Sequence, residues 1–224
     1  MISVAIDGPA GAGKSTIAKK ASKDLGFIYV DTGALYRSIG YFVMSNGGDV
    51  DNAESIVSFL PKISAEIKYI DEVQHVFVNG EDVSDKIRTE DVSRAASKVS
   101  VIPAVRDFLL SLQRNFAKKY NVVMDGRDIG TVVLPNAEVK IFLTASAEER
   151  ANRRYREQVE RGLDVNYDDI LSDIKERDYR DENREIAPLK PAEDSVYLDT
   201  SDYTVEQSVE AVMNIVKNKI QEVK

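Results

Sequence analysis

Short apolar runs alternate along this chain with longer stretches in which apolar residues recur every three or four positions. The five runs cover residues 2–7, 27–31, 122–125, 139–143 and 196–199, and they are rich in β-branched and aromatic residues. Such runs are typical of strands that are buried on both faces, and the stretches between them have helical spacing. The alternation predicts an α/β fold in which helices cover both faces of a five-stranded parallel sheet.

One segment departs from this alternation. In the segment from about residue 64 to 83, Ala65, Ile67 and Tyr69 alternate with polar residues, and Asn79-Gly80 follows the run Val76-Phe77-Val78. Strict alternation beside an Asn-Gly pair is a strong signal for a β-hairpin. We therefore expect a small antiparallel insert at about residues 62–85, and we interpret His75 inside it as an exposed strand histidine.

Some helix boundaries can also be predicted. We expect a loop at Asp31-Thr32-Gly33 before the helix that follows the second strand. Pro103 fits the first turn of a new helix, where its missing N–H group does no harm. Ser146 and Glu149 form a capping box at the start of a further helix, and Gly162 is placed to end it.

The composition narrows the possible functions. The chain has 224 residues, of which 43% are hydrophobic and 30% charged, so it can form a core and we expect one domain. A net charge of −8 makes it a poor candidate for binding nucleic acid or a membrane surface. It has no cysteine and one histidine, which excludes thiolate catalysis and argues against zinc sites. No apolar run could span a bilayer and the chain begins with a strand, so we expect a cytoplasmic protein.

The first predicted strand leads into a glycine-rich loop and then a helix. The loop reads Gly8-Pro9-Ala10-Gly11-Ala12-Gly13-Lys14-Ser15-Thr16, which fits the pattern G-x-x-x-x-G-K-[ST]. Glycines let the backbone N–H groups curl around phosphate oxygens at the positive end of the helix dipole. A chance glycine-rich turn is the alternative, but the required strand and helix are both present. The sequence therefore predicts a phosphate-binding loop in a P-loop NTPase fold, with Lys14 on the outer phosphates.

A magnesium site is expected beside this loop. The Ser15 hydroxyl can hold Mg²⁺, and Asp125 ends the third apolar strand, where it could support the ion through water. Ligands of open parallel sheets lie at the carboxyl ends of the strands. Asp31, Thr32 and Arg37 follow the second strand, so we expect them at the same edge.

Arginines are concentrated late in the chain. Eight lie between Arg150 and Arg184, on two predicted helices of which the second covers about residues 167–184. Each one alone could belong to a solvated helix surface, for example Arg153 paired with Glu149. As a group near a phosphate loop in an acidic protein, they fit the neutralisation of charge during phosphoryl transfer. A mobile helix that carries arginines could also exclude water and prevent ATP hydrolysis.

Four stretches together resemble the bacterial cytidylate kinases. They are the glycine loop, Asp31-Thr32-Gly33-Ala34-Leu35-Tyr36-Arg37, Asp125-Gly126-Arg127-Asp128-Ile129-Gly130-Thr131, and residues 175–184 with the pattern R-D-x-R-D-x-N-R. The resemblance covers essentially the whole chain, including the insert. It implies transfer of the γ-phosphoryl group of ATP to CMP or dCMP with Mg²⁺, by a protein that we expect to be a monomer. It also implies a core at about 1–33 and 104–224, a CMP-binding subdomain at about 34–103, and a lid at about 148–163.

The resemblance implies roles for individual residues as well. The loop Gly8 to Thr16 would hold the ATP phosphates. Catalytic roles would fall to Lys14, Arg127, Asp128, Arg153 and Arg184. CMP would be bound by Thr32, Arg37, Ser97, Arg106, Arg127, Asp128, Arg177, Asp181 and Arg184. Within that set, Ser97, Arg106 and Asp128 would contact cytosine, Arg37, Arg127 and Arg184 the acceptor phosphate, and Arg177 and Asp181 the sugar.

The chemistry of these residues is compatible with the roles that the resemblance implies, but it does not assign the roles without the resemblance. A cytosine edge offers an amino donor beside two acceptors, so Asp128 and Arg106 would be a complementary pair. The glycine loop and the residue spacing alone would also fit another small P-loop kinase, one that acts on UMP, AMP or a small metabolite. A nucleotide-binding switch is a further alternative, which is disfavoured because the nearest string to a guanine signature, Asn218-Lys219-Ile220-Gln221, lacks its aspartate.

Overall fold

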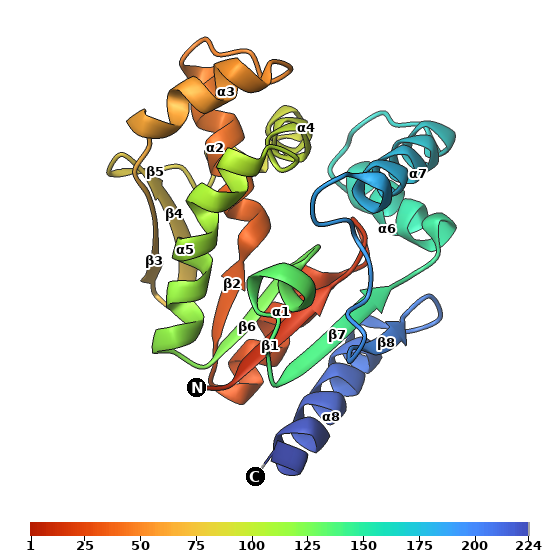
Figure 1. Ribbon diagram of the computed structural model, residues 1–224. Helices are drawn as coiled ribbons and strands as arrows, with labels where there is room; N and C mark the ends of the chain where they lie inside the picture. The colour runs from red at the N-terminus through yellow and green to blue at the C-terminus, as the bar shows by residue number, and fades with distance from the viewer. Residues whose placement is uncertain (224) are drawn as a thin grey trace. The chain divides into compact units, whose positions relative to one another are not determined.

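The computed structural model describes residues 1–223, and the chain divides into two units (Figure 1). The first unit contains residues 1–29 and everything described from residue 120 onward, and the second contains residues 30–119. No helix within residues 1–223 is long and apolar enough to cross a membrane.

The five predicted strands are confirmed. They are β1 (Ser3–Asp7), β2 (Ile28–Asp31), β6 (Val122–Gly126), β7 (Val139–Thr144) and β8 (Val196–Asp199). They form one parallel sheet in the order β2-β6-β1-β7-β8, with helices on both faces. Every residue of β1 and β6 is buried, which is why these strands read as continuous apolar runs rather than as alternating ones.

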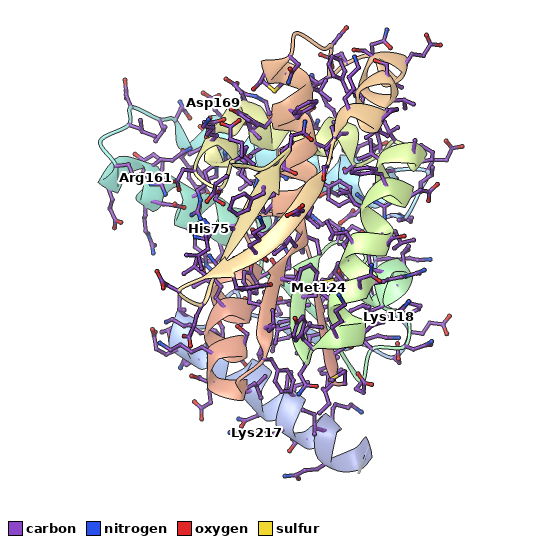
Figure 2. The ribbon with its side chains drawn as sticks, turned by 90° about the vertical axis from the view of Figure 1, so that its left-hand side faces the viewer. His75, Lys118, Met124, Arg161, Asp169 and Lys217 are labelled. Atoms are coloured by element: carbon purple, nitrogen blue, oxygen red, sulfur yellow. The ribbon has the colours of Figure 1, made fainter. Side chains whose placement is uncertain are left out.

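The core of the first unit lies between the central strands and two helices, α1 (Lys14–Leu25) and α8 (Val205–Val223). Apolar side chains at helical spacing on both helices pack against the sheet. Met124 of β6, labelled in Figure 2, is fully buried in this unit. The helix face that carries Ile17 and Ala21 enters the same core, so packing fixes the direction of α1 as it leaves the glycine loop.

Two further helices of the first unit lie side by side, α6 (Ala147–Glu160) and α7 (Tyr167–Asn183) (Figure 1). Ser146 caps α6 as predicted, because its hydroxyl accepts a hydrogen bond from the N–H group of Glu149 at 3.1 Å. The reciprocal half of the predicted capping box is not formed, since the Ser146 N–H group donates to the Ser201 hydroxyl at 2.9 Å and the Glu149 side chain accepts from Arg153. Gly162 follows the end of α6 with a φ of 75°, as predicted. A π-helical turn, η3 (Ile129–Val133), follows β6 and was not predicted.

The second unit contains the predicted antiparallel insert. Its strands are β3 (Ala65–Ile70), β4 (Val73–Val78) and β5 (Glu81–Asp82), paired in that order. His75 lies on β4 (Figure 2), and its Nδ1 atom is 2.7 Å from a carboxylate oxygen of Asp82. The histidine is partly buried rather than exposed as predicted, with 28% of its side chain exposed.

Helices make up the rest of the second unit. They are α2 (Thr32–Ser45), α3 (Ala53–Phe59), α4 (Glu90–Val99), α5 (Pro103–Lys119) and the 3₁₀ turns η1 (Leu60–Lys62) and η2 (Lys86–Arg88). Pro103 begins α5, as predicted. The prediction of a loop at Asp31-Thr32-Gly33 was wrong: α2 begins at Thr32, because the Asp31 carboxylate accepts a hydrogen bond from the Ala34 N–H group and caps the helix directly after β2.

Candidate active site

The glycine loop has the backbone of a phosphate cradle. Gly8 has a φ of 151°, and a Cβ atom there would lie 1.9 Å from the carbonyl oxygen of Leu143, so no other residue fits. Gly13 precedes α1 with a φ of 89°, and no side chain caps this helix end. The first N–H groups of α1 are therefore the donors that an anion at the helix N-terminus would use.

Lys14 lies at the first turn of α1 and is buried, with 6% of its surface exposed. Its Nζ atom donates a hydrogen bond to the carbonyl oxygen of Pro9 at 2.6 Å, so the side chain folds back over the loop. Burial lowers the pKa of Lys14 well below its usual value, and the positive charge of Arg127 lowers it further. A phosphate in the loop would supply the negative charge that stabilises the ammonium form.

Asp125 and Ser15 meet beside the loop. The Ser15 hydroxyl donates to one carboxylate oxygen of Asp125 at 2.8 Å, and the Tyr29 hydroxyl donates to the other at 2.9 Å. These hard oxygen atoms suit Mg²⁺. Within residues 1–223, no group of three or more His, Cys, Asp or Glu side chains could hold a metal. Because Mg²⁺ commonly takes one or two protein ligands and completes its shell with phosphates and water, this pair fits that ion.

Asp7 connects the end of β1 to the segment after β6. Its two carboxylate oxygens accept hydrogen bonds from the N–H groups of Ile129 and Gly130, both at 2.7 Å. Burial raises the pKa of Asp7 to about 6, although these two N–H groups act in the opposite direction. Asp7 therefore fixes the backbone that carries Asp128, a role that the sequence analysis did not assign to it.

The raised pKa of Asp7 predicts a pH dependence of stability. The folded chain keeps the Asp7 proton up to a pH of about 6, whereas the usual value is 3.8, so the folded state binds more protons between these values. The contribution of Asp7 to the free energy of unfolding should therefore fall as pH rises through this window, by about 3 kcal/mol, and stay flat above it. Asp7→Asn cannot ionise and should lose this component. Urea unfolding of both proteins without nucleotide measures it, and a difference that is constant across this window would contradict the prediction.

Arg127 and Asp181 form an ion pair between the end of β6 and α7, in which Asp181 is buried and 21% of the Arg127 side chain is exposed. The Nε atom of Arg127 donates to Asp181 at 2.8 Å. Burial alone would raise the pKa of Asp181, but Arg127, Arg177 and Arg184 together hold it below its usual value. The Nε atom of Arg177 is buried without a hydrogen-bond partner among the described residues, and burial lowers its pKa to about 10. The positive charges of three arginines in this part of the site therefore act on the Asp181 carboxylate.

Asp128 and Arg184 are also brought together. One Nη atom of Arg184 lies 3.4 Å from a carboxylate oxygen of Asp128, and both side chains are almost fully buried. The Nε atom of Arg184 donates to the carbonyl oxygen of Ala187 at 2.6 Å, which holds the guanidinium just after α7. The structure therefore places five predicted residues in one cluster of the first unit: Arg127, Asp128, Arg177, Asp181 and Arg184.

Arg150 is a site residue that the sequence analysis did not single out. It is 4% exposed and donates to the Ala10 carbonyl oxygen of the glycine loop at 3.0 Å. The same guanidinium group forms a bidentate pair with Asp178 of α7, at 3.0 and 2.5 Å. Arg150 thus joins the loop to α7, which carries Arg177 and Asp181. Eight arginines occur between residues 150 and 184, and no local pattern distinguished this one.

Arg153, predicted to be catalytic, is held by two contacts near the loop. Its Nε atom donates to Glu149 at 2.9 Å, and one Nη atom donates to the carbonyl oxygen of Thr200 at 2.7 Å. A Cβ atom on Gly13 would lie 3.9 Å from its other Nη atom. The pair with Glu149, which would suit an arginine on a solvated helix surface, is present. The Arg153 side chain is nevertheless half-buried and lies beside the phosphate loop. A contact between Arg153 and a transferring phosphate stays a prediction.

Four predicted residues lie in the second unit. Thr32 is buried at the start of α2, and Arg37 on the same helix donates to Asp31 at 2.8 Å. Arg106 is 7% exposed on α5 and lies over the ring of Tyr36. One Nη atom of Arg106 donates to the Ser100 carbonyl oxygen at 3.2 Å, and the Ser100 hydroxyl donates to the carbonyl oxygen of Ser97. Ser97 and Arg106 are therefore linked through the end of α4.

Comparison with known proteins identifies relatives along nearly the full chain. The family model described as cytidylate kinase matches residues 4–218. A cytidylate kinase from Caldicellulosiruptor bescii is 49% identical over 223 residues, covering 98% of this chain and 99% of the relative. A cytidylate kinase from Bacillus cereus is 46% identical over 215 residues, covering 96% of each chain.

A solved structure shares the fold at much lower sequence identity. An uncharacterised protein from Eubacterium ventriosum superimposes with a TM-score of 0.54 at 12% identity, covering 97% of this chain and 99% of that chain. At this identity the likeness concerns the fold alone.

Proposed function

This chain belongs to the cytidylate kinase family, and we propose that it transfers the γ-phosphoryl group of ATP to CMP or dCMP, giving ADP and CDP or dCDP. The observation that carries the proposal is the position of Lys14 in a glycine-rich loop, in the same unit as the paired groups Arg127–Asp181 and Arg184–Asp128. A loop for phosphates and a separate set of buried arginines are the parts needed to hold two anionic nucleotides.

The chemistry follows from this division of roles. A phosphate oxygen of CMP attacks the γ-phosphorus atom of ATP, a new P–O bond forms, and the bond to the β-phosphate oxygen breaks. No general base is required, because the attacking phosphate oxygen is already ionised. Lys14 stabilises negative charge on the transferring group, while Arg37, Arg127 and Arg184 hold the acceptor phosphate. Catalysis then consists of positioning and charge neutralisation.

Mg²⁺ would be held beside the glycine loop. The Ser15 hydroxyl would be its ligand and the Asp125 carboxylate would support it through water, because these oxygens already adjoin each other at 2.8 Å. When bound, the ion neutralises charge on the ATP phosphates. Tyr29 holds the second oxygen of Asp125, so the orientation of the carboxylate is set by the protein itself.

Recognition of the acceptor base is proposed to rest on Asp128, Arg106 and Ser97, and recognition of the sugar on Arg177 and Asp181. A buried carboxylate accepts from the cytosine amino group, and a guanidinium group donates to the ring acceptors. A uracil edge carries a carbonyl oxygen where cytosine has the amino group, so it would place an acceptor against Asp128. Residues 148–163 are proposed to form the lid, and the protein is proposed to act in the cytoplasm as a monomer.

The proposal is tested by one panel of acceptors. Phosphorylation of CMP, dCMP, UMP and AMP by ATP and Mg²⁺ is measured by coupled ADP formation. We expect the highest kcat/KM with CMP or dCMP. A preference for AMP or UMP, or no turnover with any of the four nucleotides, would instead indicate another small P-loop kinase.

Replacing Asp128, which is proposed to recognise the base, should weaken the use of CMP without affecting the use of ATP. Asp128→Ala removes the acceptor for the cytosine amino group and leaves that group unpaired. We expect the KM for CMP to rise at least about fivefold while the KM for ATP stays near the wild-type value. Steady-state kinetics with each substrate varied in turn measure both. An equal rise in the two KM values would indicate a structural role for Asp128 instead.

A further inference from the structure

A glutamine of the insert contacts the backbone of the residue that caps α2. The side-chain oxygen of Gln74 accepts a hydrogen bond from the Asp31 N–H group at 2.8 Å. The side-chain nitrogen of Gln74 donates to the Asp31 carbonyl oxygen at 3.3 Å. The amide thus forms the same two hydrogen bonds that a neighbouring strand would form with Asp31. Gln74 thereby fixes the backbone of Asp31 at the point where β2 ends.

The side chain of Asp31 connects this fixed backbone to Arg37. One carboxylate oxygen accepts from the N–H group of Ala34 at 2.9 Å, and the other accepts from an Nη atom of Arg37 at 2.8 Å. Gly33 lies tightly against the pair, because a Cβ atom there would be 3.1 Å from Asp31 and 3.0 Å from Arg37. The orientation of the Arg37 guanidinium group therefore depends on where the Asp31 backbone is held.

The insert offers a rigid base for Gln74. Strands β3 and β4 pair over six residues each, with Gln74 opposite Tyr69. Val76 and Val78 of β4 are buried, and the Val76 N–H group donates to the hydroxyl of Ser84 at 2.9 Å. Side chains held on paired, packed strands keep their positions better than side chains on loops.

We propose that Gln74 is a positioning residue for the acceptor phosphate, and that the antiparallel insert orients Arg37 through Asp31. This inference rests on the proposed function, in which Arg37 holds the phosphate of CMP. An arginine that is already oriented loses less conformational freedom when it binds a phosphate. Gln74 thus lowers the KM for the acceptor without touching the acceptor or the ATP.

The first test compares Gln74→Met with wild type. Methionine has a similar length but cannot form either hydrogen bond. We expect the KM for CMP to rise about fivefold, while kcat and the KM for ATP stay within about twofold, on the scale of lost hydrogen bonds. Lys68→Ala is the matched control, because Lys68 lies on β3 of the same sheet with half of its side chain exposed. It should leave both KM values unchanged.

A double-mutant cycle then tests whether Gln74 acts through Arg37. In an Arg37→Ala background, Gln74→Met should cause no further rise in the KM for CMP. The same rise in both backgrounds, or no rise in the wild-type background, would overturn the inference. If Gln74→Met does not fold, Asp31→Asn replaces it: it should also raise the KM for CMP selectively, and an unchanged KM would refute the proposal. A wild-type protein that fails to phosphorylate CMP would refute the proposed function itself.

Discussion

Lys14→Ala should lower kcat by at least about 100-fold, with little change in the melting temperature of the nucleotide-free protein. The ammonium group is expected to stabilise charge that develops on the transferred phosphoryl group, and this interaction is strongest in the transition state. Its hydrogen bond to the Pro9 carbonyl oxygen adds little to stability, because burial of the charged group opposes it. Removing the group should therefore damage catalysis far more than folding.

Lys20 supplies the matched control for this variant. It lies on the same helix, is about half exposed, and pairs with Glu206 at 3.3 Å. Lys20→Ala should leave kcat unchanged, because exposed ion pairs contribute little and this one is remote from the glycine loop. Turnover of Lys14→Ala within a few fold of wild type would contradict the assignment of the loop to phosphate binding.

The fold was predictable from the sequence where single segments carried enough information. Strand β6, which carries Asp125, reads as a run of buried residues because both of its faces are covered, and the start of the insert reads as alternating because its sheet is partly exposed. The glycine loop was equally clear, since its φ angles demand glycine at positions such as Gly13. The start of α2 was missed because the Asp31 cap replaces a loop at that point.

The contacts that organise the site were not predictable, because they join residues far apart in the chain. Arg150 contacts a glycine-loop carbonyl oxygen 140 positions away, and Asp7 binds N–H groups more than 120 positions away. Gln74 contacts Asp31 across 43 positions. Each is a polar residue whose local sequence resembles that of an ordinary surface or strand position. The direct substrate contacts were proposed through family resemblance, whereas these supporting residues required the structure.

The position of Asp181 separates two explanations of the charges on α7. Arg177, Asp181 and Arg184 are spaced for a ladder of ion pairs along one helix, and such exposed pairs add only about 0.3–0.5 kcal/mol. Instead, Asp181 is 6% exposed and pairs with Arg127, 54 positions away. Its removal would take away a carboxylate that offsets the repulsion among the guanidinium groups of Arg127, Arg177 and Arg184. The structure therefore favours a large effect on both stability and function.

We expect Asp181→Ala to lower kcat/KM for CMP at least about tenfold, with the KM for ATP little changed, because a charged hydrogen bond to the sugar is lost. The free energy of unfolding should fall by about 3 kcal/mol, the scale for breaking a buried ion pair. The pKa of Asp181 is lowered in the folded state, so this stabilisation is complete above the usual value of 3.8 and is lost as pH falls below it. The difference from wild type should shrink in that acid range.

Glu176 provides the control on the same helix. It is exposed and lies 3.8 Å from Arg180, so Glu176→Ala removes an ion pair from α7 without touching the buried cluster. It should leave kcat/KM for CMP and the free energy of unfolding near their wild-type values. Steady-state kinetics and urea unfolding of the two variants decide the matter. Unaltered CMP kinetics in Asp181→Ala would remove α7 from the acceptor site and leave Asp181 a purely structural role.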